Sequence, residues 1–460
     1  MSVFAELRSL LGDRLVTDPE VRASHGADVS YHPPAPPDAV AFPAGTGEVQ
    51  EIVRICARHA TPIVPYGAGT SVEGHVLATH GGLSMDMRRM DRVVALHAQD
   101  MDAQVQAGVT RSALNDAARG HGLFFAVDPG ADATLGGMAS TRASGTNAVR
   151  YGTMRDNVLG LEVVLADGSV IRTGGRARKS SAGYDLTRLF VGAEGTLGVI
   201  TELTVRLHAL PQAVTAAVCP FEDLAGAVDA AVAVLRAGID VARMELLDEA
   251  MLDAVRRYSS LDHPIAPTLF FEFHGSAPGV EELARATEAI ARAHRGLGFR
   301  WAADPAEREG LWRARHDAYW AALALRPGAA GLTTDVCVPI ASLAECILAT
   351  RADLAALPAP SPLVGHVGDG NFHLLLLLDP ASETEKQAAR GIVRRLVERA
   401  LACGGTCTGE HGIGLGKREY LVAEHGPAVE VMRSLKRALD PRGLMNPGKL
   451  FLDSLDEPDP

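Results

Sequence analysis

Four glycine-rich loops in the first two hundred residues constrain the fold of this chain more than any other feature. Short strand-like runs alternate with them, as at 62–65 and 161–165. Glycine has no Cβ, so the backbone N–H groups of such loops can approach a ligand closely. Any one loop could be a turn of a compact fold, but four together favour a phosphate-containing cofactor bound along an α/β domain. The loops cover residues 66–74, 129–137, 144–152 and 192–198.

The usual signatures of nucleotide-binding folds are absent from the sequence. No Gly-x-Gly-x-x-Gly segment follows a strand-like run. Residues 412–417 fail the P-loop pattern, because His411 occupies the position of its first glycine and Arg418 follows the lysine. Rossmann and kinase-type interpretations of the glycine loops are therefore not favoured.

Pro211 marks the expected boundary between two domains. Upstream, residues 2–11 and 47–60 read as amphipathic helices, and Asp167-Gly168 predicts a hairpin between two strand-like runs. Downstream, strands alternate with helices, which favours a mostly antiparallel sheet with helices on one face. The strands are expected at 268–274, 334–339 and 374–378, one helix around 312–320, and the other helices at 221–237, 280–295, 343–357, 382–403 and 429–439.

Composition limits the class of binding partner. The 460 residues are 47% hydrophobic, which suits two or three domains with buried cores. A formal net charge of -12, with no basic block to offset it, argues against binding to nucleic acid or anionic membranes. An anionic substrate would therefore need positive charge placed locally in its site.

Cysteine spacing and hydropathy limit the cofactors and the location. The six cysteines include no Cys-x-x-Cys pair, which argues against a zinc ribbon, an iron–sulfur cluster or an attached haem and favours reduced thiols. No apolar run reaches the ~18 residues of a transmembrane helix, and no signal or transit segment is evident. We expect a cytoplasmic protein, with peripheral attachment to the inner face of a membrane left open.

Two histidines, His366 and His373, bracket a Gly-Asp-Gly turn, and Glu410-His411 follows in another glycine-rich loop. The turn lets both imidazoles converge, and imidazole with carboxylate is a ligand set for zinc-like metals. His366, His373 and Glu410 are therefore candidate metal ligands. Because adjacent side chains point in different directions, we favour His411 as a general base, with a further metal ligand as the alternative.

The local sequence leaves the roles of two cationic side chains open. Arg315 lies in an arginine- and tryptophan-rich helix, where it is either part of a solvated face or an anion-binding group. Lys449 follows Asn446-Pro447-Gly448, which is also a plain turn signal.

Several longer stretches resemble one flavoprotein superfamily, that of vanillyl-alcohol oxidase and p-cresol methylhydroxylase. Within it the chain resembles the D-lactate dehydrogenase (cytochrome) type of D-2-hydroxyacid dehydrogenase. The resemblance spans nearly the whole chain, from Phe42 to Lys449. It rests most specifically on DPGAD at 128–132, SGTNAVRYGTMRD at 144–156, FVGAEGTL at 190–197, GHVGDGNFH at 365–373 and GTCTGEHGIG at 405–414.

This resemblance implies an α+β fold. A helical lead-in at 1–36 would precede a two-subdomain FAD-binding domain of the p-cresol-methylhydroxylase type at 37–211. Residues 212–452 would form a substrate-binding cap and C-terminal FAD-linked oxidase region, with a largely antiparallel sheet and a C-terminal helical segment. A frayed tail would follow at 453–460.

The resemblance also implies which residues bind FAD. They belong to the loops of the first domain, with one residue from the C-terminal segment. They are Pro65, Gly67, Gly69, Thr70, Ser71, Pro129, Gly130, Ala131, Leu135, Gly136, Met138, Ser144, Gly145, Asn147, Ala148, Tyr151, Glu194, Gly195, Gly198, Ile200 and Asn446.

The same resemblance implies a second cofactor and the catalytic groups. One divalent metal ion, zinc or manganese, would be bound by the metal-ligand candidates named above. His411 would accept the hydroxyl proton, Arg315 would hold the substrate carboxylate, and Lys449 would lie close to the flavin and the substrate.

Three departures from the family pattern refine these implications. Relatives with covalently attached flavin usually carry a histidine in the first glycine loop, and Gly69-Thr70-Ser71 here implies non-covalent FAD. Leu375 replaces a polar residue of relatives that act on 2-hydroxyglutarate, which implies a substrate with a small or apolar far end. Arg142 stands where many relatives have glycine.

The implied activity is oxidation of a small D-2-hydroxy acid, D-lactate or a similar acid with an apolar side chain, to the 2-keto acid. Hydride would pass to FAD, and the electrons would pass on to a separate acceptor, cytochrome c or a quinone-linked carrier. Alternatives are a glycolate-oxidase-type FAD subunit, a D-2-hydroxyglutarate dehydrogenase, an alkyl-glycerone-phosphate synthase and, in another class, a non-catalytic flavin- or metal-binding protein. We expect a monomer or a homodimer.

Overall fold

The computed structural model describes residues 1–259 and 264–452, so the tail expected at 453–460 lies outside the described residues. The chain forms two compact units. Unit 1 contains Met1–Ser144, Gly152–Leu210 and the described residues from Glu410 onward; unit 2 contains Gly145–Tyr151 and Pro211–Gly409. The chain therefore passes from one unit to the other more than once.

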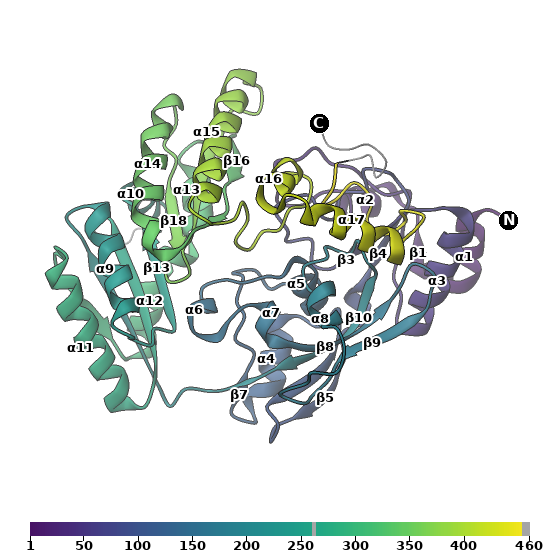
Figure 1. Cartoon of the computed structure of the whole chain (residues 1–460), viewed down its shortest axis with the longest axis horizontal. Helices are drawn as coiled ribbons and strands as arrows, with labels where there is room; N and C mark the ends of the chain where they lie inside the picture. The colour runs from purple at the N-terminus through teal and green to yellow at the C-terminus, as the bar shows by residue number, and fades with distance from the viewer. Residues whose placement is uncertain (260–263, 453–460) are drawn as a thin grey trace. The chain divides into compact units, whose positions relative to one another are not determined.

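A four-stranded sheet in unit 1 has the order β1-β2-β4-β3, with β2, β4 and β3 parallel. Parallel strands need a crossover connection, and α3 (Thr46–His59) supplies it between β2 and β3, which lie on either side of β4. Helices α1 (Val3–Leu11) and α3 pack side by side over an apolar core (Figure 1). The strands are β1 (Leu15–Val16), β2 (Ala39–Ala41), β3 (Ile63–Tyr66) and β4 (Leu83–Asp86).

The segment after Glu410 extends this sheet. Backbone hydrogen bonds join Ile63 N to the Leu444 carbonyl (2.8 Å) and Asn446 N to the Ile63 carbonyl (2.8 Å). By their contacts, the described residues from Glu410 onward belong to unit 1, although the sequence groups them with residues 212–409 in one region. Their helices are α16 (Leu421–His425) and α17 (Ala428–Leu439).

A five-stranded antiparallel sheet, β5-β6-β10-β8-β9, forms the rest of unit 1 with a small two-stranded sheet of β7 and β11. The hairpin predicted at Asp167-Gly168 is confirmed as the turn between β8 and β9, with Gly168 at φ +80°. The strands are β5 (Val93–His97), β6 (Asp102–Gln106), β7 (Leu123–Phe124), β8 (Val158–Val164), β9 (Val170–Gly174), β10 (Val199–Arg206) and β11 (His208–Ala209). The helices are α2 (Pro19–Ser24), α4 (Arg111–Arg119), α5 (Leu135–Thr141), α7 (Met154–Asn157) and α8 (Leu186–Phe190).

Arg142 ends α5 in the left-handed conformation, with φ +56°. This conformation favours glycine, the residue that the family pattern implies at this position. Here the side chain folds back, and its guanidinium donates hydrogen bonds to the Val191 carbonyl at 3.2 and 3.3 Å. These bonds offset part of the backbone strain, and the helix end keeps its shape.

Unit 2 is built on an eight-stranded sheet whose strands pair antiparallel, in the order β15-β12-β14-β13-β18-β19-β16, with β17 also paired to β19. The largely antiparallel sheet is therefore confirmed. The strands are β12 (Ala213–Pro220), β13 (Arg243–Leu247), β14 (Thr268–Gly275), β15 (Arg300–Ala302), β16 (Ala330–Thr333), β17 (Val336–Cys337), β18 (Leu363–His366) and β19 (Asn371–Leu378).

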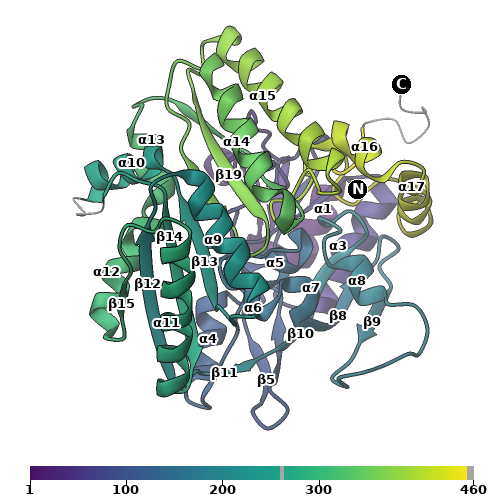
Figure 2. The ribbon, with the colours of Figure 1, turned by 60° about the vertical axis from the view of Figure 1, so that its left-hand side comes forward.

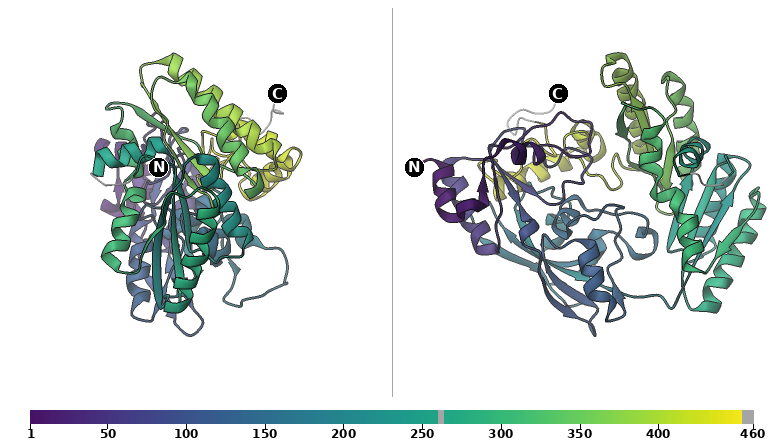
Figure 3. Two further views of the ribbon diagram at one scale, coloured as in Figure 1. Left: turned by 90° about the vertical axis from the view of Figure 1, so that its left-hand side faces the viewer. Right: turned by 180° about the vertical axis from the view of Figure 1, so that it is seen from behind.

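The expectation of helices on one face of this sheet was wrong. Phe270 packs with the core of α10, α12 and α13, while the next residue, Phe271, is also fully buried and faces the other side. Figures 2 and 3 show α9 and α11 running along the strands. The helices are α6 (Ala148–Tyr151), α9 (Leu224–Arg236), α10 (Glu249–Ser259), α11 (Ala277–Ala293), α12 (Pro305–His316), α13 (Ala318–Ala324), α14 (Leu343–Asp353) and α15 (Glu383–Ala402).

Asp248, buried at the start of α10, yields a pH-dependent prediction. Its Oδ1 accepts hydrogen bonds from Met251 N (2.9 Å) and Leu363 N (3.1 Å). Burial raises the pKa of Asp248 to about 6, although these two bonds oppose the rise. The folded state therefore binds more protons than the unfolded state between about pH 4 and 6, so the free energy of unfolding falls as pH rises through that window.

Asp248→Asn removes this titration. Between pH 4 and pH 7, the unfolding free energy of the parent chain should fall by on the order of 3 kcal/mol more than that of the variant. Urea unfolding at several pH values measures the difference. Parallel pH profiles for the two chains would show that the carboxyl does not titrate in this window.

Candidate functional site

The glycine-rich loops of unit 1 enclose one large cavity. Its empty space is about 1250 Å³, part of which opens to solvent. Most of the residues predicted to bind FAD line it. They are Pro65, Gly67, Gly69, Thr70, Ser71, Pro129, Ala131, Gly136, Met138, Ser144, Glu194, Gly195, Gly198, Ile200 and Asn446.

The first loop has the features of an anion-binding site. No backbone amide of residues 68–72 donates a hydrogen bond to another residue of the described chain. A row of such N–H groups forms a concave site for an anion. Gly69 has φ +69°, and a Cβ there would collide with the Tyr66 hydroxyl, so the loop needs glycine at this point. The residues of the cavity therefore fit a phosphate-containing cofactor.

Several predicted FAD-binding residues are placed elsewhere. Among the described residues, those that line the cavity do not include Gly130 or the fully buried Leu135. Gly145, Asn147, Ala148 and Tyr151 belong to unit 2, where Asn147 Oδ1 accepts a hydrogen bond from Arg243 Nε (2.6 Å) and the Tyr151 hydroxyl contacts His274 Nδ1 (2.7 Å).

Glu194 connects three parts of the cavity wall. Its carboxylate accepts hydrogen bonds from Ile413 N (2.7 Å) and Gly414 N (2.9 Å), and it lies 3.1 Å from His75 Nε2. Burial alone would raise the pKa of Glu194, but His75 and the two backbone donors hold it below its ordinary value. The residue adopts a left-handed backbone, with φ +53°. The sequence pattern pointed to Glu194 but not to His75, which also lines the cavity.

Glu194→Gln should destabilise unit 1. The amide removes the charge opposite His75 and turns an N–H group toward one of the two backbone donors. Breaking such a buried pair costs about 3 kcal/mol. Chemical unfolding at pH 7 measures this loss, and Glu51→Gln, at an exposed ion pair with Arg54, should change the unfolding free energy by less than about 0.5 kcal/mol. Equal effects of the two variants would contradict the role of Glu194.

Glu410 and His411 line the same cavity as the glycine loops. Asn446 lines it as well, and its side-chain amide donates to the carbonyls of Glu194 (2.7 Å) and His75 (3.1 Å). Lys449 is not among the cavity-lining residues of the described chain. Its buried ammonium donates to the Leu77 carbonyl (2.8 Å), so in this structure it braces the wall that carries Asn446.

His366 and His373 lie together in unit 2, on neighbouring strands. Both are 5% exposed, and their ring centroids are 5.3 Å apart. The Nδ1 atoms are held by oxygen acceptors, the Glu245 carboxylate for His366 (2.6 Å) and the Thr334 carbonyl for His373 (2.9 Å). Acceptors of this kind place the proton on Nδ1 of a neutral imidazole, so Nε2 carries the lone pair. This is the tautomer in which histidines bind metals, and the pair fits a divalent ion.

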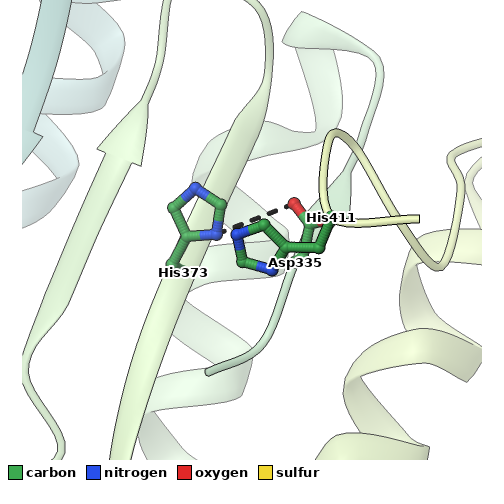
Figure 4. Close-up of side chains that lie close together, drawn as sticks. All are labelled: Asp335, His373 and His411. Carbon is green, nitrogen blue, oxygen red and sulfur yellow. Dashed lines mark ion pairs between the residues drawn. The ribbon is translucent and has the colours of Figure 1, made fainter. Parts of the chain in front are cut away.

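Asp335 and Asn371 support this pair. Asp335 Oδ1 lies 3.7 Å from His373 Nδ1, as Figure 4 shows with a dashed line. Asn371 donates its amide to Asp335 Oδ1 (2.9 Å) and to the Val336 carbonyl (2.8 Å). These bonds tie β19 to β17 and to the residue that precedes it.

Arg315, on α12, is joined to the histidine pair by Glu245. Arg315 Nε donates to Glu245 Oε2 at 2.6 Å, while Oε1 of the same carboxylate holds His366. Burial would raise the pKa of Glu245, but His366 and Arg315 keep it below its ordinary value. Sequence reasoning missed Glu245, although a single carboxylate between the apolar residues Met244 and Leu246 was a signal. Leu375, the residue expected to reflect substrate size, is buried in the core of unit 2.

Comparison with known proteins gives consistent matches. A family model described as "FAD binding domain" matches residues 37–174, and one described as "FAD linked oxidases, C-terminal domain" matches residues 210–450. "Probable D-lactate dehydrogenase, mitochondrial" of Danio rerio is 53% identical over 98% of this chain and 91% of its own length. "D-lactate dehydrogenase [cytochrome], mitochondrial" of Arabidopsis thaliana is 46% identical over 98% and 80%.

A solved structure of p-cresol methylhydroxylase with substrate bound shares the fold. Its TM-score is 0.79 at 19% identity, and the match covers 98% of this chain and 96% of that one. The expected α+β fold of the p-cresol-methylhydroxylase type is thereby confirmed. Among the described residues, no helix is both long enough and apolar enough to cross a bilayer.

Proposed function

The chain belongs to the FAD-linked oxidases, in the group of the D-lactate dehydrogenases (cytochrome), and we propose that it oxidises D-lactate to pyruvate. The observation that carries this proposal is the position of His411 and Glu410 in the wall of the glycine-lined cavity. A potential proton acceptor and a potential metal ligand thus share a cavity whose loop amides suit the phosphates of FAD.

FAD, when bound non-covalently in this cavity, takes up the hydride of the oxidation. The amides of residues 68–72 would hold its phosphates, and Asn446, fixed by the carbonyls of Glu194 and His75, would offer a rigid polar contact. The Glu194 carboxylate keeps the loop of His411 in place through Ile413 and Gly414. The protein thereby contributes binding and orientation to the chemistry of the cofactor.

A divalent metal ion, zinc or manganese, would be held by His366, His373 and Glu410. When bound, such an ion would supply Lewis-acid polarisation of the substrate. The acceptors on Nδ1 of the two histidines keep both rings in the metal-binding tautomer. His411 would accept the hydroxyl proton, and Arg315 would bind the substrate carboxylate through its terminal guanidinium nitrogens.

The electrons must leave the flavin for a separate acceptor. The sequence has no motif for a cluster or a haem. The relative from Arabidopsis thaliana carries "cytochrome" in its name, and we assign cytochrome c as the acceptor here, ahead of a quinone-linked carrier.

Anaerobic mixing with hydroxy acids tests the proposal. D-lactate should bleach the visible absorbance of the metal-replete flavoprotein, and L-lactate should not. Glycolate and D-2-hydroxyglutarate, tested in parallel, should reduce it more slowly, and oxidised cytochrome c should restore the colour. A yellow protein that none of these acids bleaches would contradict the proposal and indicate a non-catalytic flavin-binding protein.

A further inference from the structure

Glu245 occupies an unusual position among the charged residues of unit 2. It lies in the middle of β13 and is 0% exposed. One carboxylate oxygen contacts His366 Nδ1 and the other contacts Arg315 Nε, both at 2.6 Å. A single side chain therefore joins the histidine on β18 to the arginine on α12. A buried carboxylate with a partner on each oxygen has little room to move.

A second buried glutamate, on the neighbouring strand, has partners of the same kinds. Glu272, on β14, lies 2.7 Å from His274 Nε2 and 3.5 Å from Arg243 Nε. The residue types are the same, glutamate with histidine and arginine, and Glu272 is also buried. The difference is that His366 and Arg315, the partners of Glu245, are the proposed metal ligand and the proposed carboxylate-binding group.

We propose that Glu245 is a positioning residue that sets the tautomer of His366 and the direction of Arg315 together. The proposal rests on the proposed function, because it concerns the same substrate and metal. Glu245 would thereby influence both the affinity for the metal ion and the binding of the substrate carboxylate. Both should change when this one side chain changes.

The chemistry of glutamine makes the proposal testable. His366 Nδ1–H and Arg315 Nε–H both donate, so each needs an oxygen acceptor. Glutamine in place of Glu245 offers one oxygen and one NH₂ group. If the NH₂ group faces His366, the ring proton moves to Nε2, the atom that would bind the metal. If it faces Arg315, two donors oppose each other and the guanidinium turns away. Either orientation breaks one of the two contacts.

The experiment compares Glu245→Gln with Glu272→Gln as a matched control. The FAD-loaded chain is stripped with a chelator and titrated with Mn²⁺ alone, and the unbound ion is followed by its electron paramagnetic resonance signal. Glu245→Gln should weaken Mn²⁺ binding by about 10- to 100-fold. Glu272→Gln should leave Mn²⁺ affinity within about twofold, while thermal unfolding reports a comparable loss of stability for both variants.

A second variant and a second measurement distinguish the proposed role from a folding defect. Glu245→Asp keeps the charge but withdraws the carboxylate by one methylene, so we expect Mn²⁺ affinity between those of the parent chain and Glu245→Gln. At saturating Mn²⁺, the KM for D-lactate should rise at least tenfold in Glu245→Gln, because Arg315 is no longer directed.

Three results would overturn the proposal. They are unchanged Mn²⁺ affinity in Glu245→Gln, an equal loss of affinity in Glu272→Gln, and absence of Mn²⁺ binding by the parent chain. Failure of the proposed function gives a different result, namely a parent chain that binds Mn²⁺ but whose flavin D-lactate does not bleach.

Discussion

His411→Asn should slow the anaerobic reduction of the flavin by D-lactate by about 10²- to 10⁴-fold, the usual contribution of a general base. Asparagine can form hydrogen bonds but cannot take up the hydroxyl proton at neutral pH. FAD should stay bound, because the amides of residues 68–72 and most of the cavity wall remain unchanged. Stopped-flow absorbance gives the rate, and the ratio of flavin to protein absorbance gives the FAD content.

The control for this variant is His121→Asn, at an exposed histidine of unit 1 that does not belong to the cavity wall. Its reduction rate should equal that of the parent chain. Fast reduction by the His411 variant would remove this residue from the role of base. Loss of FAD from the variant would instead assign His411 to the binding of the cofactor.

His373→Ala should abolish tight metal binding and, with it, the reaction with D-lactate. Loss of Lewis-acid polarisation is worth several kcal/mol, which corresponds to a rate at least about 10²-fold lower. The variant lacks the imidazole that the Thr334 carbonyl orients. Metal analysis after gel filtration and the rate of flavin reduction measure the two effects.

Chelator treatment of the parent chain provides the matching control. Removal of the ion should reproduce the slow reduction of His373→Ala, and added Zn²⁺ or Mn²⁺ should restore the parent chain but not the variant. A chelated parent chain that still reacts rapidly would rule out a metal in the reaction. Restoration of the variant by the same ion would show that His373 is not an essential ligand.

Short sequence patterns correctly predicted the elements whose structure depends mainly on adjacent residues. Asp167-Gly168 predicted its hairpin because a two-residue turn of this kind needs a residue with positive φ, and Gly168 has one. The run 374–378 was predicted correctly as a strand, but the prediction missed that both faces of this strand are covered. All eight residues of β19 are buried. A strand that is apolar without alternation has both faces covered, which is why helices pack on both sides of the sheet.

The contacts that complete the candidate sites were not predictable from local pattern. Glu245 and His366 are 121 residues apart, and Glu194 and Ile413 are 219 residues apart. Nothing in either segment encodes its partner, because the pairing is decided by the order of strands in a sheet or by the meeting of two loops. Glycine clusters located the cavity, since they act through backbone conformation. They did not identify His75, whose role depends on Glu194.

The division of the chain also determines when the cofactor can enter. Glu410, His411 and Asn446 line the cavity, and residues 444–446 bind the edge of β3, so unit 1 requires residues that the ribosome makes after all of unit 2. Residues 211–409 can therefore fold during synthesis, as domains generally do. The nascent chain up to residue 409 holds the glycine loops but only an incomplete cavity. We therefore expect FAD to bind fully only after residues 410–446 are made, and a shortage of the cofactor to affect chains whose unit 2 is already folded.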